Sequence, residues 1–301
     1  MTEAVHLAVN ARAGRGGVPV RTVRALIEAA GHTVIELGAT SAEHTEHSVR
    51  SAVADGATRV VAVGGDGLVH WIVQALAGTP VVLGIIATGT GNDAARALGL
   101  PLSDLQAAVN DALGDGVPID AMHSTAGWAL TVATTGFSAT VNERANTIGW
   151  LKGEARYKAA TLAALPRLAP QNLIVGIDGV DHRVEATFIA IGNTRFFGGG
   201  MAVCPDAVAN DGLLDVCIVG PLGRLKLLRF FPSVFSGAHR HNPVVSLLRG
   251  RTVSLAGAAA GSVWADGEYM APLPITFEVI PGALLIASAR PGYGGETAQL
   301  G

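Results

Sequence analysis

The sequence predicts an α/β domain followed by a β-rich domain. Apolar runs alternate with helical patterns over the first 120 residues, whereas short strand-like runs separated by glycine turns dominate after that point. Strands that alternate with helices form a mostly parallel sheet with helices on both faces. We therefore expect an α/β domain over 1–121, to which the segment 288–301 can return, and a β-rich domain over 122–287.

The first domain is expected to alternate regularly between strand and helix. Gly31 ends the first helical pattern, and Ser103 is expected to cap the last one because its hydroxyl can accept a hydrogen bond from the first helical turn. The expected strands are 5–9, 33–37, 59–63 and 81–86, and the expected helices are 20–30, 42–54, 69–76, 94–98 and 103–113.

The second domain is expected to consist of short strands joined by tight turns. Asp-Gly and Pro-Gly pairs favour turns because glycine readily adopts positive φ angles. Such pairs occur at 178–179, 211–212, 266–267 and 281–282, and the polar, glycine-rich tail 291–301 is expected to fray. The expected strands are 128–134, 172–177, 183–191, 213–219, 252–255, 275–280 and 284–287, and the expected helices are 154–165 and 222–231.

The composition is that of a folded protein without a nucleic-acid partner. Of the 301 residues 49% are apolar and 15% charged, and the net charge is −3. Cys204 and Cys217 have no metal-binding or disulfide spacing, so they are expected to be core thiols in a reducing compartment. The N-terminal residues do not form a signal peptide, and the sequence has no run of about 18 uncharged apolar residues. We expect a cytoplasmic protein, although a mean hydropathy of +0.40 leaves room for an apolar surface.

Two glycine turns are the most informative local feature. Gly64-Gly65-Asp66-Gly67 and Gly89-Thr90-Gly91-Asn92-Asp93 each follow a buried strand and precede a helix. Glycine allows a phosphate to approach the backbone closely, and a helix N-terminus offers free N–H groups and positive dipole charge. Ligands of parallel sheets bind at the carboxyl ends of the strands, where both turns are expected to lie. The pair predicts a phosphotransferase.

Other interpretations of the glycine turns are weaker. The segment 89–94 matches the dinucleotide fingerprint G-x-G-x-x-A, but the acidic residue required about 20 positions later would fall at Asn110-Asp111, inside an expected helix. The glycine-rich turn 10–17 is either a third phosphate contact or a plain flexible turn, and it is not a Walker loop because no G-K-[ST] follows.

Several acidic residues lie at turns or strand ends. Aspartate is common there for structural reasons, because it caps helices and tolerates left-handed backbone geometry. Phosphoryl transfer, however, needs carboxylates that hold Mg²⁺ and accept the proton of the attacking hydroxyl. The candidates are Asp66, Asp93, Asp120, Asp211, Asp215, Asp266 and Glu268.

A set of segments in fixed order resembles the diacylglycerol kinase catalytic family, the soluble bacterial lipid kinases related to sphingosine and ceramide kinases and more distantly to NAD kinases. The segments are V-A-V-G-G-D-G at 61–67, G-T-G-N-D-A-A-R-A-L-G at 89–99, G-F-S-A at 136–139, G-N-T-R-F-F-G-G-G at 192–200, P-D-A-V-A-N-D-G-L-L-D-V at 205–216 and A-D-G-E at 265–268. This resemblance implies a doubly wound first domain like that of NAD kinase and phosphofructokinase, and a β-sandwich as the second domain.

The resemblance also implies roles for individual residues. ATP would bind between the domains, a structural Mg²⁺ would be held by Asp211 with the carbonyls of Val208 and Leu213, and Asp266 or Glu268 would be the general base. An acidic network of Asp66, Asp93 and Asp120 would position the catalytic metal. The implied nucleotide contacts are Asn10, Thr40, Gly64, Gly65, Asp66, Gly67, Gly89, Thr90 and Asn92.

The implied function is an ATP- and Mg²⁺-dependent lipid kinase of phospholipid metabolism, cytoplasmic and peripheral at the membrane. Two departures from the family pattern stand out: Leu68 replaces the usual threonine of G-G-D-G-T, and Asn10-Ala11-Arg12-Ala13-Gly14 replaces N-P-x-S-G. An NAD kinase-like enzyme, or a catalytically impaired nucleotide- or lipid-binding relative, remain alternatives. The acceptor lipid and the oligomeric state, including a homodimer, stay open.

An apolar cluster within 225–235 carries basic neighbours. Leucine, phenylalanine and valine side chains recur there beside Arg224, Lys226 and Arg229. Core packing is one interpretation, and a membrane-docking surface is the other, since a lipid kinase must reach its substrate in the interface.

Overall fold

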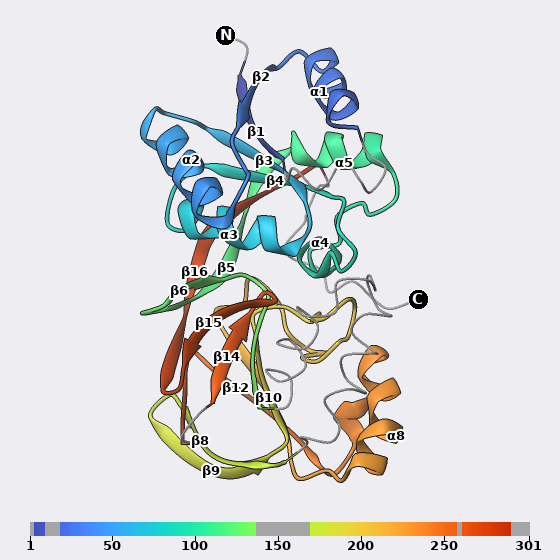
Figure 1. Cartoon of the computed structure of the whole chain (residues 1–301), viewed down its shortest axis with the longest axis vertical. Coiled ribbons are helices and arrows are strands. Elements are labelled where there is room, and N and C mark those ends of the chain that lie inside the picture. The colour runs from blue at the N-terminus through green and yellow to red at the C-terminus, as the bar shows by residue number, and fades with distance from the viewer. Residues whose placement is uncertain (1–2, 10–18, 137–168, 258–260, 290–301) are drawn as a thin grey trace. The chain divides into compact units, whose positions relative to one another are not determined.

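A computed structural model describes residues 3–9, 19–136, 169–257 and 261–289 (Figure 1). The chain divides into two compact units, Met1–Ala121 with Pro281–Gly301, and Met122–Ile280. The expected helix 154–165 and the tail 291–301 lie outside the described residues. No helix in the described ranges is long and apolar enough to cross a membrane.

The first unit is built on a parallel sheet. Its strand order is β2-β1-β3-β4-β16, and the end of β16 joins β4 in parallel through Leu285 and Ile286. All six residues of β3 are buried, as expected for a central strand covered on both faces. The strands are β1 (Ala4–Val9), β2 (Thr33–Leu37), β3 (Arg59–Gly64), β4 (Val82–Ala87) and β16 (Ile275–Ser288), and β5 (Asp115–Ser124) pairs with β16.

Helices lie on both faces of this sheet, so the predicted doubly wound architecture is confirmed. Side chains of α1 and α5 share a core with β1, β3 and β4, including Val23, Ile27 and Val109. Helices α2 and α3 pack together on the other face (Figure 1). The helices are α1 (Val20–Ala29), α2 (Ala42–Ala54), α3 (Asp66–Leu76), α4 (Asp93–Ala97) and α5 (Leu105–Ala112).

Two helix starts differ from the sequence expectation. Asp104, and not Ser103, caps α5, because its carboxylate accepts a hydrogen bond from the Ala107 N–H at 3.1 Å. Helix α3 begins at Asp66 instead of residue 69. The backbone N–H groups of Leu68 and Val69 both donate to the Gly65 carbonyl, so the glycine turn itself forms the first helical turn.

The second unit is a sandwich of two antiparallel sheets. The start of β16 extends the first sheet through β13, β8 and β9, and the other sheet has the order β12-β11-β10-β7-β14-β15. Side chains such as Ile191, Val216 and Phe277 fill the shared core. The strands are β6 (Gly127–Ala129), β7 (Val132–Gly136), β8 (Gln171–Ile177), β9 (Val180–Ala186), β10 (Phe188–Gly192), β11 (Leu214–Val219), β12 (Val245–Gly250), β13 (Thr252–Gly257), β14 (Ser262–Ala265) and β15 (Glu268–Pro272).

A second core lies on the outer face of the six-stranded sheet. Helix α8 (Arg224–Phe235) and the 3₁₀ helix η3 (Ala238–His241) cover this face. Cys204 and Cys217 are buried free thiols, as the sequence predicts for core residues. Burial raises the pKa of Cys217 to about 12, so this thiol stays protonated.

Several strands differ from the sequence expectation. The expected strand 183–191 is two strands, β9 and β10, separated at Thr187, whose N–H donates to the Val219 carbonyl. The break expected at 281–282 is absent. Strand β16 continues there because Gly282 adopts φ +62 and donates its N–H to Asp120 Oδ1 at 2.9 Å. Strands β5, β12, β14 and β15 have no counterpart in the sequence expectation, since they are short, half-exposed or interrupted by polar residues.

Arg59 is the first residue of β3, and its side chain reaches the end of α5. Its Nη1 donates to the carbonyls of Ala112 at 3.1 Å and Gly114 at 2.9 Å, and its Nε lies 3.4 Å from Glu3 Oε1. The side chain is buried, and helix-terminal carbonyls have no partner within their own helix. Arg59 therefore supplies hydrogen-bond donors to two carbonyls at the end of α5.

We expect Arg59→Ala to lower the free energy of unfolding by about 2–4 kcal/mol, because it leaves buried carbonyls without donors. Chemical denaturation of the purified protein measures this change. Arg21→Ala is the control, since Arg21 is exposed on α1 and its loss should change stability by less than about 0.5 kcal/mol. Equal effects of the two variants would contradict a structural role for Arg59.

Candidate active site

The two glycine turns lie at the same edge of the parallel sheet, as predicted. Gly64 ends β3 and Ala87 ends β4, and these two residues are register partners. The Thr88 N–H donates to the Gly64 carbonyl at 2.8 Å, so the hydrogen bonding of the sheet continues into the turns. The turns therefore form one continuous backbone surface at the carboxyl ends of the strands.

The backbones of the turns approach so closely that side chains are excluded. A Cβ atom on Gly89 would lie 2.6 Å from Gly65 Cα and 2.8 Å from Asn92 Oδ1. A Cβ atom on Gly65 would lie 3.1 Å from Gly89 Cα. Packing therefore requires glycine at position 89, whereas a Cβ atom on Gly65 would need the Gly89 backbone to move by a few tenths of an ångström. The two glycines leave peptide groups uncovered beside the start of α3.

Polar groups converge on this surface. No side chain caps α3, whose N-cap residue is Gly65. Asp66 Oδ1 accepts a hydrogen bond from the Ala94 N–H at 3.1 Å, which ties the start of α3 to α4. Asn92 adopts left-handed geometry at φ +53 and donates its Nδ2 to the Gly89 carbonyl at 3.0 Å. Within the described residues, Asn92 Oδ1 and Thr88 Oγ1 are buried without a hydrogen-bond partner, so a polar ligand would complete the local hydrogen bonding.

Leu68 packs inside the first turn. Its side chain is buried, and a Cβ atom on Gly64 would lie 2.6 Å from Leu68 Cδ2. The leucine that replaces the family threonine thus fills the space over Gly64. It contributes to packing of the turn and leaves ligand hydrogen bonding to the backbone.

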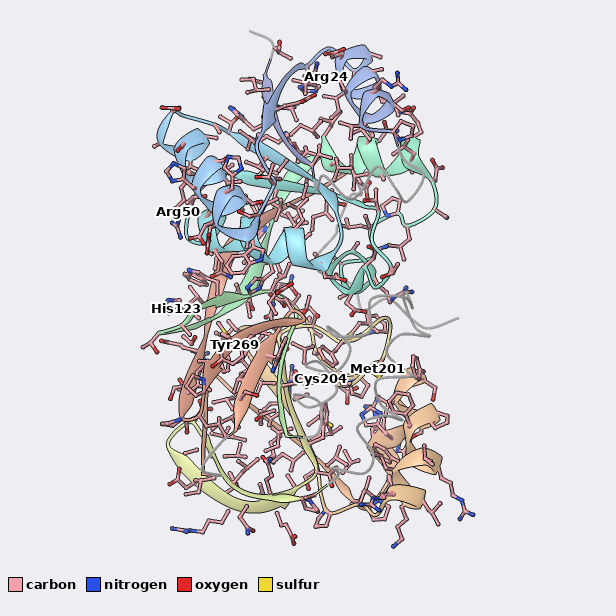
Figure 2. All side chains as sticks on the ribbon, viewed as in Figure 1. Arg24, Arg50, His123, Met201, Cys204 and Tyr269 are labelled. Atoms are coloured by element: carbon pink, nitrogen blue, oxygen red, sulfur yellow. The ribbon has the colours of Figure 1, made fainter. Side chains whose placement is uncertain are left out.

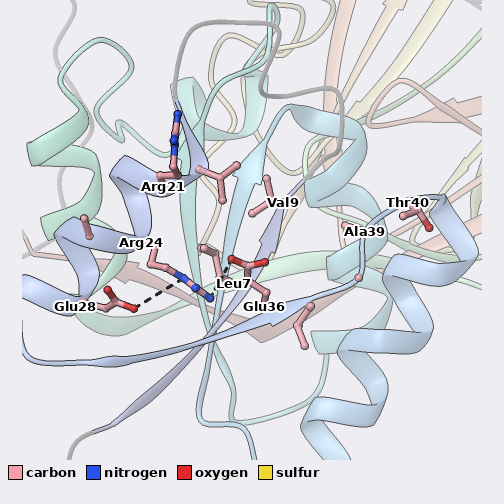
Figure 3. Close-up of a pocket in the computed structure, with 12 residues that line it drawn as sticks. Leu7, Val9, Arg21, Arg24, Glu28, Glu36, Ala39 and Thr40 are labelled. Atoms are coloured by element: carbon pink, nitrogen blue, oxygen red, sulfur yellow. Dashed lines mark ion pairs between the residues drawn. The ribbon is translucent and has the colours of Figure 1, made fainter.

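A cavity of about 600 Å³ opens beside the ends of β1 and β2 (Figure 3). Thr40 lines it, and the Thr40 hydroxyl is 2.7 Å from His44 Nδ1. Arg24 crosses the cavity from α1, with Nη2 3.0 Å from Glu36 Oε1. Asn10 lies outside the described residues. The lining residues are Leu7, Val9, Val20, Arg21, Arg24, Ala25, Glu28, Glu36, Leu37, Gly38, Ala39 and Thr40.

Two of the candidate acidic residues of the first unit lie in its interior. Asp93 and Asp120 are buried, and Asp120 Oδ1 accepts the Gly282 N–H on β16. Among the residues that the structure describes, no three His, Cys, Asp or Glu side chains come close enough to hold a metal ion. Mg²⁺ in phosphotransferases commonly uses one or two carboxylates together with substrate phosphates, so a cage made by the protein alone is not required.

In the second unit, Asp266 and Glu268 occupy the turn between β14 and β15. Asp266 is buried at φ +53, and its Oδ1 accepts hydrogen bonds from Thr131 N at 2.7 Å and Thr131 Oγ1 at 2.6 Å. Its Oδ2 accepts from Leu130 N at 3.1 Å. Both carboxylate oxygens therefore bind the chain before β7. Glu268 begins β15 and is partly exposed.

Asp211 lies in the loop before β11, beside an arginine. Asp211 Oδ1 accepts the Leu213 N–H at 3.1 Å, and Oδ2 pairs with Arg249 Nη2. Arg249 Nε also donates to Asp215 Oδ2 at 3.1 Å. Burial raises the pKa of Asp215 to about 6, and the charge of Arg249 offsets part of this rise. The arginine supplies positive charge to both carboxylates.

Sequence reasoning missed several residues that shape these sites. Thr131 lies in an expected strand, and nothing in its local pattern indicates that it anchors Asp266 across 135 positions of chain. Arg249 belongs to β12, which was not expected. Thr88 directly precedes the second glycine turn, and its position there is the only sequence signal that could have identified it.

Comparisons with known proteins agree with the observed fold. Residues 4–124 match the diacylglycerol kinase catalytic domain, and residues 131–288 match the YegS C-terminal NAD kinase beta sandwich-like domain. The chain is 40% identical over 269 residues to a diacylglycerol kinase of Mycobacterium tuberculosis, covering 87% of each protein. It is 26% identical over 254 residues to a diacylglycerol kinase of Bacillus subtilis, covering 83% of this chain and 84% of the relative.

A solved structure shares the whole fold. The structure of a candidate diacylglycerol kinase from Bacillus anthracis superimposes with a TM-score of 0.78 at 22% identity, and the match covers 95% of this chain and 97% of the other. At this identity the likeness supports the architecture of the two units.

We expect Gly89→Ala to weaken ATP binding by roughly tenfold or more, because the added methyl group must push the two turns apart. Calorimetric titration with ATP measures the change. Gly223→Ala is the matched control, since Gly223 has φ −76 and no atom within 4 Å of an added Cβ. ATP affinity of Gly89→Ala equal to that of the control would contradict a role of the two glycine turns in ATP binding.

Proposed function

The chain belongs to the diacylglycerol kinase family, and we propose that it transfers the γ-phosphate of ATP to the hydroxyl of a diacylglycerol-like lipid. The observation that carries the proposal is the pair of turns at Gly65 and Gly89, which uncovers backbone at the start of α3. The 40% identity with a diacylglycerol kinase over most of both chains supports the acceptor class.

We propose that the phosphates of ATP bind over the first-unit turns. The start of α3 has no side-chain cap, so its N–H groups and dipole favour an anion. Gly64, Gly65, Gly67 and Gly89 allow the phosphates to approach the backbone, and Thr90 and Asn92 extend the surface along the second turn. These contacts hold the transferred phosphoryl group in position, which is the main source of catalysis in this reaction class.

The cavity beside β1 and β2 is the proposed place for the base and ribose. It is large enough for a small-molecule ligand, and Thr40 and Arg21 provide polar groups on its walls. In this arrangement Asn10, from the segment that follows β1, would contact the same nucleotide.

We propose Asp66 and Asp93 as the protein ligands of a catalytic Mg²⁺, with Asp120 fixing the nearby strand. Asp66 sits in the glycine turn itself, and Asp93 begins the helix that follows the second turn. This donor set fits Mg²⁺, which prefers hard oxygen ligands and retains water and phosphate oxygens. When bound, the metal would neutralise charge on the β- and γ-phosphates.

We assign the proton acceptor to Glu268 and a positioning role to Asp266. Both oxygens of Asp266 are engaged by Leu130 and Thr131, so this side chain fixes the turn that carries Glu268. In the step, the oxygen of the lipid hydroxyl forms a bond to the γ-phosphorus, and the Glu268 carboxylate takes the proton that this hydroxyl loses. The bond from phosphorus to the β,γ-bridging oxygen breaks, and ADP leaves with the electron pair.

The direct test is turnover with defined acceptors. The purified protein, Mg²⁺ and radiolabelled ATP should convert diacylglycerol in detergent micelles into phosphatidic acid. NAD in place of the lipid separates a lipid kinase from an NAD kinase-like enzyme, and we expect no labelled NADP. Absence of phosphatidic acid under all conditions, with ATP still bound, would favour a non-catalytic relative.

We further propose that the protein works at the cytoplasmic face of the membrane.

Glu268→Gln should lower kcat by about 10²–10⁴-fold with little change in melting temperature, because it keeps the shape of the partly exposed side chain and removes its proton-accepting charge. Asp266→Asn should lower kcat and also destabilise the protein by about 1–3 kcal/mol, since an amide group cannot accept all three hydrogen bonds. Kinetics with diacylglycerol and thermal melts separate the two roles. The matched control is Glu278→Gln on β16, where the side chain is exposed. A near-normal kcat for Glu268→Gln would place the base elsewhere.

A structural Mg²⁺ at Asp211, with the carbonyls of Val208 and Leu213, remains a proposal that must account for Arg249. The ion pair occupies Asp211 Oδ2, so a metal ion would have to displace the guanidinium. If Mg²⁺ binds there, it should raise the melting temperature by a few degrees, and chelator should lower it, because a ligand of the native state adds stability. Arg249→Gln should then strengthen the effect and Asp211→Ala should remove it. Identical melts of the wild type with Mg²⁺ and with chelator would contradict the site.

A further inference from the structure

Helix α8 is apolar on two opposite faces. Leu227, Phe230 and Val234 recur at spacings of three and four and pack into the core beneath the helix. Leu225 and Leu228 lie on the side of the helix away from this core, and their exposed fractions are 77% and 41%. Among the described residues, the core contacts therefore account for one face of the helix and assign no packing role to the other.

The outward face is also basic. Helix α8 contains Arg224, Lys226 and Arg229 and no acidic residue, although the whole chain has a net charge of −3. Within the part of the chain that the structure describes, Lys226 and Arg229 take part in no ion pair. On the neighbouring η3, Arg240 is paired with Asp206 and contributes no further uncompensated charge.

We propose that the outer face of α8 docks the protein onto an anionic lipid bilayer. Leucines on a surface helix flanked by lysine and arginine match the pattern of interfacial helices, which bury apolar side chains at the boundary between headgroups and acyl chains. The long stems of Lys226 and Arg229 can lie along the apolar region while their charged ends reach lipid phosphates. The inference rests on the proposed function, whose acceptor is a membrane lipid.

Charge favours a bilayer over a second copy of the chain. A twofold dimer would bring the same α8 face of both subunits together, and its basic residues would then oppose each other. Anionic lipid headgroups instead neutralise those residues, and a fluid bilayer accommodates exposed leucines without a complementary pocket.

The test is co-sedimentation with sucrose-loaded vesicles in the absence of ATP. Vesicles of phosphatidylcholine with phosphatidylglycerol are compared with vesicles of phosphatidylcholine alone. We compare the wild type with Leu225→Gln/Leu228→Gln and with Lys226→Gln/Arg229→Gln, because glutamine keeps helix propensity. The matched control is Val180→Gln/Arg183→Gln, which removes an exposed apolar and an exposed basic side chain from β9.

The wild type and the β9 control should bind the anionic vesicles and bind phosphatidylcholine weakly. The leucine variant should lose roughly tenfold or more in partition coefficient, and the basic variant about fivefold per charge removed. Absence of wild-type binding, or equal binding by all four proteins, would overturn the inference. It would also fail if size-exclusion chromatography with light scattering finds a dimer that the α8 variants dissociate.

Turnover of a short-chain diacylglycerol that is monomeric in solution separates this inference from the proposed function. The α8 variants should phosphorylate it at the wild-type rate, since docking is not needed there. Loss of vesicle binding together with unchanged turnover supports the docking role. A wild type that binds anionic vesicles through α8 but phosphorylates no diacylglycerol would uphold the docking surface and contradict the kinase proposal. If the α8 variants lose soluble turnover in proportion to vesicle binding, the docking assignment is wrong.

Discussion

The close approach of the Gly65 and Gly89 backbones is the constraint on which the first unit's proposed site depends. Two adjacent parallel strands end in register, and each continues into a glycine turn that leads into a helix. A methyl group on Gly89 would lie 2.6 Å from Gly65 Cα, so the two turns can share one edge in this geometry only if position 89 lacks a side chain. The same absence uncovers the peptide groups at the uncapped start of α3. Packing and the proposed anion binding thus depend on the same glycines.

In the second unit, the buried carboxylate of Asp266 fixes the turn that carries the proposed general base, Glu268. Both carboxylate oxygens of Asp266 accept hydrogen bonds from the backbone of Leu130 and from the backbone and hydroxyl of Thr131, which are 135 or more positions away in sequence. Its positive φ is tolerated because these hydrogen bonds fix the turn. The sequence presents Asp266 and Glu268 as equivalent candidates for the general base. Their environments separate them, since one side chain is committed to the fold and the other begins a strand with partial exposure.

Much of the fold could be predicted from sequence because it depends on local signals. The alternation of buried strands and helices predicted the parallel sheet, and the pattern of each turn correctly placed both glycine turns at one edge of it. The start of α3 was missed because hydrophobic periodicity begins after the glycines, while the helical hydrogen bonds begin at Gly65. Strand β12 was missed because it is half-exposed, and with it the pairing of Arg249 to Asp211 and Asp215. Contacts of this kind join distant segments and leave no local pattern.

The most direct measurement of the central claim is amide NMR of protein with ¹⁵N-labelled glycine. Addition of ATP with Mg²⁺ should shift the amide resonances of Gly65, Gly67 and Gly89 by more than addition of adenosine does, because only the nucleotide brings phosphates to these N–H groups. Gly179, in the β8–β9 turn, should stay unchanged and serves as the internal reference. Saturating ATP that leaves the turn glycines unshifted while it perturbs other resonances would contradict the proposed phosphate site.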